Sequence, residues 1–168
     1  PHKRQNRLEE QTISTVSMDY GYMTTEDDSK EEEGYTPILV SIDRNTGKLN
    51  ANVVPSKGVN PYAVKRVVQN LNLLGYKRLT LKYDQEPAIL ALREAIKAES
   101  QIEIIPEESP VGESQADGEV ENAVRAIKAQ VRTMRMSLES RYQTKIKEND
   151  PIVAWMVSEA ADSINRFQ

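Results

Sequence analysis

The chain has 168 residues, which is enough for one well-buried domain and short for two. It is 38% hydrophobic and 29% charged, and no apolar run is long enough to span a bilayer, so we expect a globular protein without membrane contact. The absence of cysteine excludes disulfides and thiolate metal sites, and it suits an intracellular, nuclear or cytoplasmic location. The only histidine, His2, is terminal, so any chemistry must use carboxylates, hydroxyls or amines.

The net charge of −4 conceals an uneven distribution. Residues 26–33, EDDSKEEE, hold six acids and one base, so they contribute −5 and leave the rest at +1. We predict that this acidic run is a solvated loop between two strands. Residues 1–12 are interpreted as a basic N-terminal tail or linker, and residues 13–168 as one domain. The overall charge therefore does not exclude a nucleic-acid partner.

The first part of the domain has the patterns of three antiparallel strands. Residues 13–22 alternate apolar and polar side chains, which predicts a strand with one buried face and with Asp19 on the other, polar face. Residues 36–43 and 49–54 are predicted as two further strands. The turn formers Asn45, Thr46 and Gly47 between them indicate a hairpin.

Helices and strands then alternate. Residues 60–74 are predicted to form a helix with Asn60 as N-cap and Pro61 as its first residue. A strand at 78–84, a helix at 86–100 and a fifth strand at 102–106 follow. Two strand-helix-strand crossovers imply parallel pairing at that end of the sheet.

Two helices complete the domain, after a Ser-, Gly- and Pro-rich loop predicted at 107–118. The first helix is expected at 117–140. The second, at 150–167, opens with an Asp-Pro pair like the Asn-Pro pair at residue 60, and its predicted core stripe is Ile152, Trp155, Met156, Ala160 and Ile164. The fold class is therefore α/β, with a five-stranded mixed sheet covered by helices.

Acidic residues occupy positions where this fold can bring them together. Asp19 lies in the first strand, Asp84 ends the fourth, and Glu119 and Glu121 lie in the first turns of the long helix. If the first and fourth strands are neighbours, the two aspartates converge and the helix adds a third carboxylate. Carboxylates without His or Cys favour Mg²⁺ or Mn²⁺, and pairs of such ions support in-line phosphoryl displacement.

Several segments resemble the catalytic core of retroviral and retrotransposon integrases, which has a ribonuclease-H-like fold. VSMDYGY is similar to the strand with the first catalytic Asp, and LTLKYDQEP to the segment with the second. ILVSIDRNTGKLNANVVPSKG resembles the second and third strands, and SPVGESQADGEVENAVRAIK resembles the Pro-x-x-x-Gly-x-x-Glu-x-x-Asn motif. One departure is Asp84-Gln85-Glu86-Pro87, where many relatives read Asp-Asn-Gly.

The resemblance implies that Asp19, Asp84 and Glu121 are catalytic residues and ligands of Mg²⁺ or Mn²⁺, with two ions expected. Glu113 and Glu119 are rival candidates for the third acid. Glu119 is about 200° around the helix from Glu121, so both cannot face the same ions. We choose Glu121, and we expect Gly118 to let the backbone approach the sheet there.

The long helix has two distinct faces. An apolar stripe must face the sheet, and it consists of Val120, Val124, Ile127, Val131, Met134 and Leu138. Glu121 begins a second face that continues with Arg125, Lys128, Arg132 and Arg135. Basic side chains often fill a solvated face, but a face without further acids favours contact with DNA phosphates. We take Arg125, Lys128 and Arg132 as the DNA-binding residues.

The implied function is that of an integrase from an LTR retrotransposon: metal-dependent DNA 3′-end cleavage and strand transfer by a homo-oligomer bound to element ends and target DNA. A transposase or a ribonuclease-H-like nuclease of the same fold is an alternative, although residues 60–74 lack the extra acid of a ribonuclease H. A catalytically inactive, domesticated DNA-binding or assembly module is another.

Overall fold

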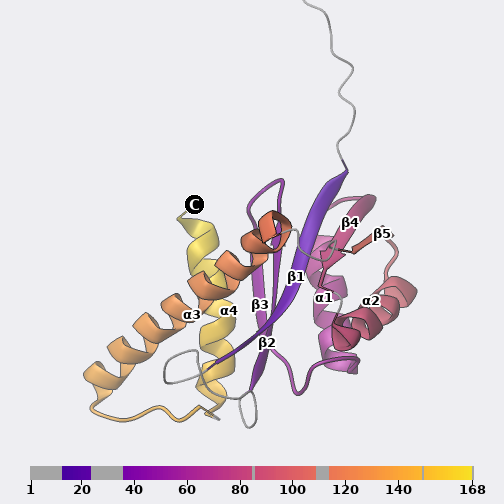
Figure 1. Ribbon diagram of the computed structural model, residues 1–168. Coiled ribbons are helices and arrows are strands. Elements are labelled where there is room, and N and C mark those ends of the chain that lie inside the picture. The colour runs from indigo at the N-terminus through magenta and orange to yellow at the C-terminus, as the bar shows by residue number, and fades with distance from the viewer. Residues whose placement is uncertain (1–12, 24–35, 85, 109–113, 149, 168) are drawn as a thin grey trace, which may run out of the picture.

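A single five-stranded mixed sheet organises the chain (Figure 1). The structure is a computed structural model, and it describes residues 13–23, 36–84, 86–108, 114–148 and 150–167. The strand order is β3-β2-β1-β4-β5, with β1 antiparallel to β2 and parallel to β4. The strands are β1 Ser14–Tyr22, β2 Pro37–Asp43, β3 Leu49–Val53, β4 Arg78–Tyr83 and β5 Glu103–Glu108.

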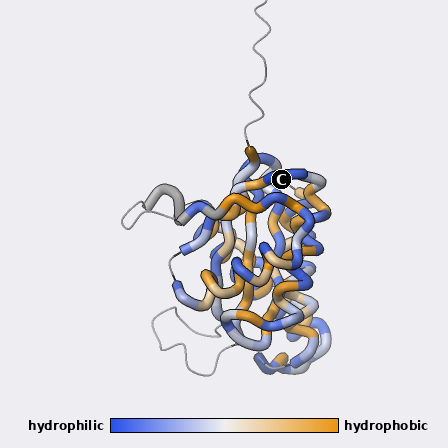
Figure 2. The backbone as a smooth tube through the Cα atoms, turned by 90° about the vertical axis from the view of Figure 1, so that its right-hand side faces the viewer, coloured by the Kyte–Doolittle hydropathy of each residue, from blue (hydrophilic) through white to orange (hydrophobic). Residues whose placement is uncertain are grey.

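Helices cover both faces of the sheet (Figure 1). One hydrophobic core lies between the sheet and α1 and α2, and a second lies between β2, β3 and the pair α3 and α4. Figure 2 shows hydrophobic stretches gathered in the strands between these layers. The helices are α1 Pro61–Leu73, α2 Pro87–Glu99, α3 Ser114–Tyr142 and α4 Pro151–Arg166. In the described residues, every helix is too short or too polar to cross a bilayer.

The predicted fold class and the predicted order of strands and helices along the chain are confirmed, as is the start of α1. The Asn60 side chain accepts a hydrogen bond from the Ala63 backbone N–H at 2.8 Å, and Pro61 opens the helix. The Asp150-Pro151 start differs, because Asp150 makes no side-chain cap to α4. Its carboxylate instead accepts from the Lys147 backbone N–H at 2.7 Å, which closes the turn before the helix.

Four other expectations are wrong or untested. β1 is buried on both faces, because α3 covers the side that carries Ser17 and Gly21. The loop predicted at 107–118 is shorter, since β5 continues to Glu108 and α3 begins at Ser114. The tail at 1–12 and the acidic run at 26–33 lie outside the described residues.

The core stripe of α4 is also rotated from the predicted one. Trp155 is 54% exposed and Ile152 is 39% exposed. Met156 and Ala160 are buried as expected, but Val153, Val157 and Ala161 complete the buried face. This helix therefore has apolar residues on more of its surface than the sheet covers. Periodicity alone could not identify which of its faces packs against the sheet.

Asp43, at the end of β2, is a buried hydrogen-bonding centre for three segments. Its carboxylate accepts from the hydroxyls of Ser14, Thr46 at 2.6 Å and Tyr76 at 2.9 Å. Burial alone would raise the pKa of Asp43, but these hydrogen bonds and that of the Asn45 N–H lower it below the ordinary 3.8. One side chain thus connects the start of β1, the β2–β3 turn and the segment before β4.

Replacing Asp43 with Ala should lower the free energy of unfolding by about 3 kcal/mol at pH 7, because the hydroxyls of Ser14 and Tyr76 lose a charged acceptor. Thr46→Val, which removes one bond, should cost about 1 kcal/mol. Because the folded-state pKa is lowered, the contribution of Asp43 is complete above about pH 4 and is lost on acidification below it. Urea unfolding at pH 7 and pH 3 measures both; equal losses for the two variants would contradict this role.

Candidate active site

The parallel pairing of β1 with β4 places Asp19 beside Asp84. The register pairs Ser17 with Lys82 and Met18 with Tyr83, so the next positions are Asp19 and Asp84. Neighbouring strands lie about 4.8 Å apart. The side chains of Met18 and Tyr83 are in the core under α1 and α2, so alternation directs Asp19 to the face that α3 covers.

Asp19 is half-buried and lies in a negative electrostatic environment. Burial is the largest cause that raises its pKa to about 6. A hydrogen bond from the Tyr20 backbone N–H, at 2.7 Å, opposes that rise. The charges of Asp84 and Glu86 raise the pKa further, while Lys57 lowers it. The structure therefore brings Asp84 and Glu86 close enough to Asp19 for their charges to act on it.

Glu121, the predicted third acid, lies on α3 with its side chain 52% exposed. Its carboxylate accepts from Arg125 one turn later, at 3.2 Å. Glu119 is paired with Arg44 of the β2–β3 turn, also at 3.2 Å. Glu113 lies outside the described residues. Among the residues that the structure describes, no three acids, histidines or cysteines are grouped closely enough to hold a metal ion.

The close approach between α3 and the sheet occurs at Gly21 and not at Gly118. A Cβ atom added at Gly21 would lie 2.7 Å from Val124 Cγ1, whereas one at Gly118 would meet nothing within 4 Å. The expectation for Gly118 is therefore wrong. Gly21 is two residues after Asp19, and Val124 is three residues after Glu121, so this contact brings the helix over the strand that carries the first acid.

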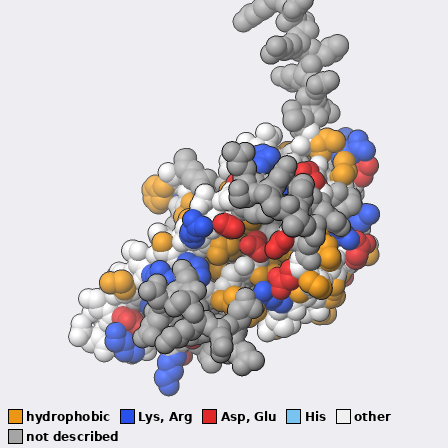
Figure 3. Space-filling view, viewed as in Figure 1, with side chains coloured by type: hydrophobic (Ala, Val, Ile, Leu, Met, Phe, Trp, Pro, Cys, Tyr) orange, Lys and Arg blue, Asp and Glu red, His pale blue; other side chains and the backbone are white. Residues whose placement is uncertain are grey.

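The basic residues of α3 differ in their surroundings. Arg125 and Arg132 are exposed, and Lys128 is half-buried. Arg135 instead bonds to Glu139 at 3.1 Å and to the carbonyl oxygen of Ile146. Arg135 therefore fixes the connection between α3 and α4. Figure 3 shows acidic side chains gathered near the middle of the face seen in Figure 1, with basic side chains toward the side on which α3 runs.

Sequence reasoning missed Lys57 and Glu86. The Lys57 ammonium donates to Glu86 Oε1 at 2.9 Å and lies over the rings of Tyr20 and Tyr22, at 5.6 and 4.9 Å from their centroids. Burial lowers the pKa of Lys57, but bonds to Glu86 and Tyr22 outweigh it and raise the pKa above its ordinary value. The only sequence signal was the unusual Asp84-Gln85-Glu86-Pro87 turn.

Lys82 is a second unanticipated cation. Its side chain is only 7% exposed and its ammonium lies 3.9 Å from Glu107 on β5. The strand register places it between Ser17 and Glu107, two residues before Asp84 on the same face of the sheet. A buried ammonium requires nearby negative charge, so it partly balances the acids at this end of the sheet.

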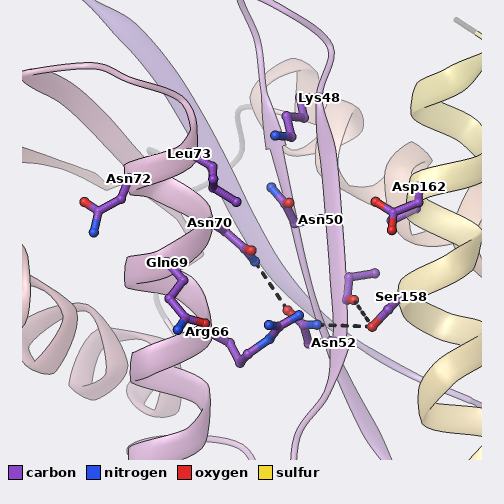
Figure 4. Close-up of a pocket in the computed structure, with 12 residues that line it drawn as sticks. Lys48, Asn50, Asn52, Arg66, Gln69, Asn70, Asn72, Leu73, Ser158 and Asp162 are labelled. Atoms are coloured by element: carbon purple, nitrogen blue, oxygen red, sulfur yellow. Dashed lines mark hydrogen bonds between the residues drawn. The ribbon is translucent and has the colours of Figure 1, made fainter.

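A separate groove of about 550 Å³ lies between α1, β3 and α4 (Figure 4). Five of its twelve lining residues are Asn or Gln, and it does not include the acidic residues above. Asn52 accepts from Asn70 and donates to Ser158, both at 3.3 Å. These bonds join α1 and α4 across the outer strand of the sheet, which indicates a structural role.

The raised pKa of Asp19 makes the metal-free protein less stable at neutral pH. The folded state retains the proton up to about pH 6, whereas the unfolded chain releases it near 3.8, so stability falls as the pH rises through that interval. Asp19→Asn should therefore raise the free energy of unfolding by up to about 3 kcal/mol at pH 7.5, and by little at pH 4. Urea unfolding without metal, with Asp162→Asn as an exposed control, tests this; equal gains at both pH values would contradict it.

Comparisons with known proteins support the fold. Neither a protein-family model nor a curated protein sequence matches the chain. Among solved structures, the BIV integrase catalytic core domain is similar to it with a TM-score of 0.57 and 22% identity, over 92% of this chain and 84% of that one. The HTLV-2 integrase catalytic core domain in complex with magnesium, in its trimeric form, is similar with a TM-score of 0.60 and 16% identity. That match covers 92% of this chain and 86% of that one.

A chain of the simian T-cell lymphotropic virus intasome gives a TM-score of 0.63 at 16% identity, over 92% of this chain. This chain spans about half of that one, 49%. The TM-scores establish a similar fold, and at identities of 22% and below they establish nothing beyond the fold. The chain therefore has the ribonuclease-H-like fold of retroviral integrase catalytic cores, with the same arrangement of a five-stranded mixed sheet and helices.

Proposed function

We propose that this chain is the catalytic core of an integrase, carried by an LTR retrotransposon. It would cut DNA near the 3′ end of the element and join that end to target DNA. The observation that supports the proposal is that β1, which contains Asp19, pairs in parallel with β4, which ends one residue before Asp84, in a sheet of the integrase fold. The sequence resemblance supports the choice of integration over other phosphodiester reactions.

Asp19, Asp84 and Glu121 would hold two ions of Mg²⁺ or Mn²⁺. The donor chemistry fits, because carboxylate oxygens suit hard cations and Asp19 lies in a negative environment that a divalent cation would relieve. When bound, such ions supply a nucleophile and neutralise charge on the phosphate. The HTLV-2 catalytic core forms a complex with magnesium, which is consistent with this choice.

Glu121 must leave Arg125 to join the two aspartates. The ion pair between them is exposed on both sides, with 71% of the Arg125 side chain and 52% of the Glu121 side chain accessible. Exposed pairs one helical turn apart contribute only about 0.5 kcal/mol. That is far less than the gain from a carboxylate–metal bond. Arg125, once released, would become available to a DNA phosphate.

DNA would lie along α3, where Arg125, Lys128 and Arg132 follow Glu121. Arg135 is left out of this surface because its contacts to Glu139 and Ile146 are internal. The related structures include an intasome and dimeric and trimeric forms of a catalytic core. We therefore propose that this chain also acts as a homo-oligomer on element ends and target DNA.

A catalytically inactive DNA-binding or assembly module is a second candidate. The observation that favours it is the pairing of Glu121 with Arg125, together with the lack of a three-acid group among the described residues. Both candidates share the DNA-binding face of α3. They differ in whether the aspartates bind metal and support cleavage.

Glu121→Gln should abolish Mn²⁺-dependent nicking of a supercoiled plasmid, and Asp19→Asn should do the same, because each removes a metal ligand. Glu119→Gln should keep most of the activity, since Glu119 is paired with Arg44. Gel assays on the folded proteins measure this. Loss of nicking in Glu119→Gln with retention in Glu121→Gln would refute the assignment, and inactivity of the unmodified chain with intact DNA binding would favour the second candidate.

Replacing Arg125 and Lys128 together by Gln should weaken DNA binding for all sequences. It should also flatten the slope of log affinity against log salt by up to about two units, since each phosphate contact contributes about 0.9. Arg78→Gln with Arg166→Gln is a control with the same charge change, on β4 and α4. Fluorescence anisotropy at several salt concentrations measures both. Equal slopes for the two double variants would show a general charge effect and no specific DNA surface.

A further inference from the structure

The segment that follows Asp84 is where the sequence departs from the integrase pattern described above. Glu86 is the N-cap residue of α2, but its side chain makes no hydrogen bond to that helix. It accepts from the Lys57 ammonium at 2.9 Å instead. Lys57 precedes Glu86 by 29 positions, so this hydrogen bond joins two loops at the same end of the sheet.

Lys57 has a fixed position at that end. Its side chain is 22% exposed and lies over the rings of Tyr20 and Tyr22, which belong to the strand that carries Asp19. The next residue, Gly58, has a φ of +90° and donates its backbone N–H to the Tyr20 hydroxyl at 3.0 Å. Few residues other than glycine adopt that conformation readily, so the turn directs Lys57 toward the tyrosines.

We propose that the Lys57–Glu86 ion pair is a positioning device that holds Asp84 beside Asp19 for metal binding. The ammonium contacts β1 through two aromatic rings and contacts Glu86, two residues after Asp84, through a charge-assisted hydrogen bond. It therefore links β1 to the N-cap residue of α2, just after the aspartate. This inference rests on the proposed metal site.

Positioning and simple electrostatics make different predictions for metal affinity. Removing Lys57 alone would delete a positive charge near the site and would strengthen metal binding by Coulomb attraction, which would mask any loss of positioning. The double variant Lys57→Met with Glu86→Gln removes one positive and one negative charge, so the net charge is unchanged. Any change in its affinity then reports the lost ion pair.

The test is the dissociation constant of the folded 168-residue chain for Mn²⁺, measured by electron paramagnetic resonance of the free ion. K57M/E86Q should bind Mn²⁺ about tenfold more weakly or worse, the usual effect of removing a group that orients a metal ligand. Lys57→Arg keeps the charge, the ring contact and the carboxylate partner, so it should bind within about threefold of the unmodified chain. R78M/E103Q, which removes an exposed ion pair of 2.8 Å between β4 and β5, is the matched control and should bind normally.

Unchanged Mn²⁺ affinity in folded K57M/E86Q would overturn the proposal. If that variant does not fold, Glu86→Asp keeps the charge but shortens the side chain by one methylene, and it should bind several-fold more weakly; normal binding would overturn the proposal equally. The variant Asp19→Asn distinguishes failure of the positioning proposal from failure of the proposed metal site. If Asp19→Asn binds Mn²⁺ as the unmodified chain does, the metal site itself is misassigned, whereas loss in Asp19→Asn with normal K57M/E86Q rejects only the positioning role.

Discussion

The parallel pairing of β1 with β4 is the constraint on which the rest of the structure depends. The connections through α1 and α2 move in the same direction across the sheet, and right-handed crossovers therefore place both helices on one face. The opposite face is left to α3 and α4. The same register makes Asp19 and Asp84 neighbours. One set of backbone hydrogen bonds thus determines the layers of the fold and the position of the candidate site.

Three acids near the site have a hydrogen-bond partner from the protein itself. Glu121 accepts from Arg125, Glu86 from Lys57, and Asp19 from the Tyr20 backbone N–H. The three interactions differ in strength, because the Glu121 pair is exposed while the Lys57 ammonium is held between a carboxylate and two rings. Under the proposed function, a metal ion would displace Arg125 from Glu121 and leave the Lys57–Glu86 pair intact.

Local patterns in the sequence were enough to predict most of the fold. Hydrophobic periodicity located the nine elements of the described residues with shifts of a few residues, and the alternation of strands and helices indicated the parallel end of the sheet. The convergence of Asp19 and Asp84 was predicted on the condition that the first and fourth strands are neighbours, and β1 does pair with β4. The stripe of α4 was misplaced because that helix has apolar residues on more than one side, and only packing selects the face with Val153 and Val157.

Contacts between distant segments could not be predicted in this way. Lys57 and Glu86 are 29 positions apart, and neither belongs to a periodic pattern, so their meeting depends on how two loops end at the same edge. Gly21 and Gly118 are both small residues near predicted acids. The choice between them depends on where α3 crosses β1, which no single segment encodes.

The outer edge of β3 has a further consequence for the integrity of the protein. The side-chain amide of Asn165, near the end of α4, accepts from the Leu49 N–H and donates to the Leu49 carbonyl, both at 2.8 Å. It satisfies the same two groups that a neighbouring strand would satisfy. Unpaired strand edges promote self-association. A chain that ended before Asn165 would therefore leave these two backbone groups of β3 unpaired. Aggregation through the β3 edge would then compete with folding, even though the hydrophobic cores were complete.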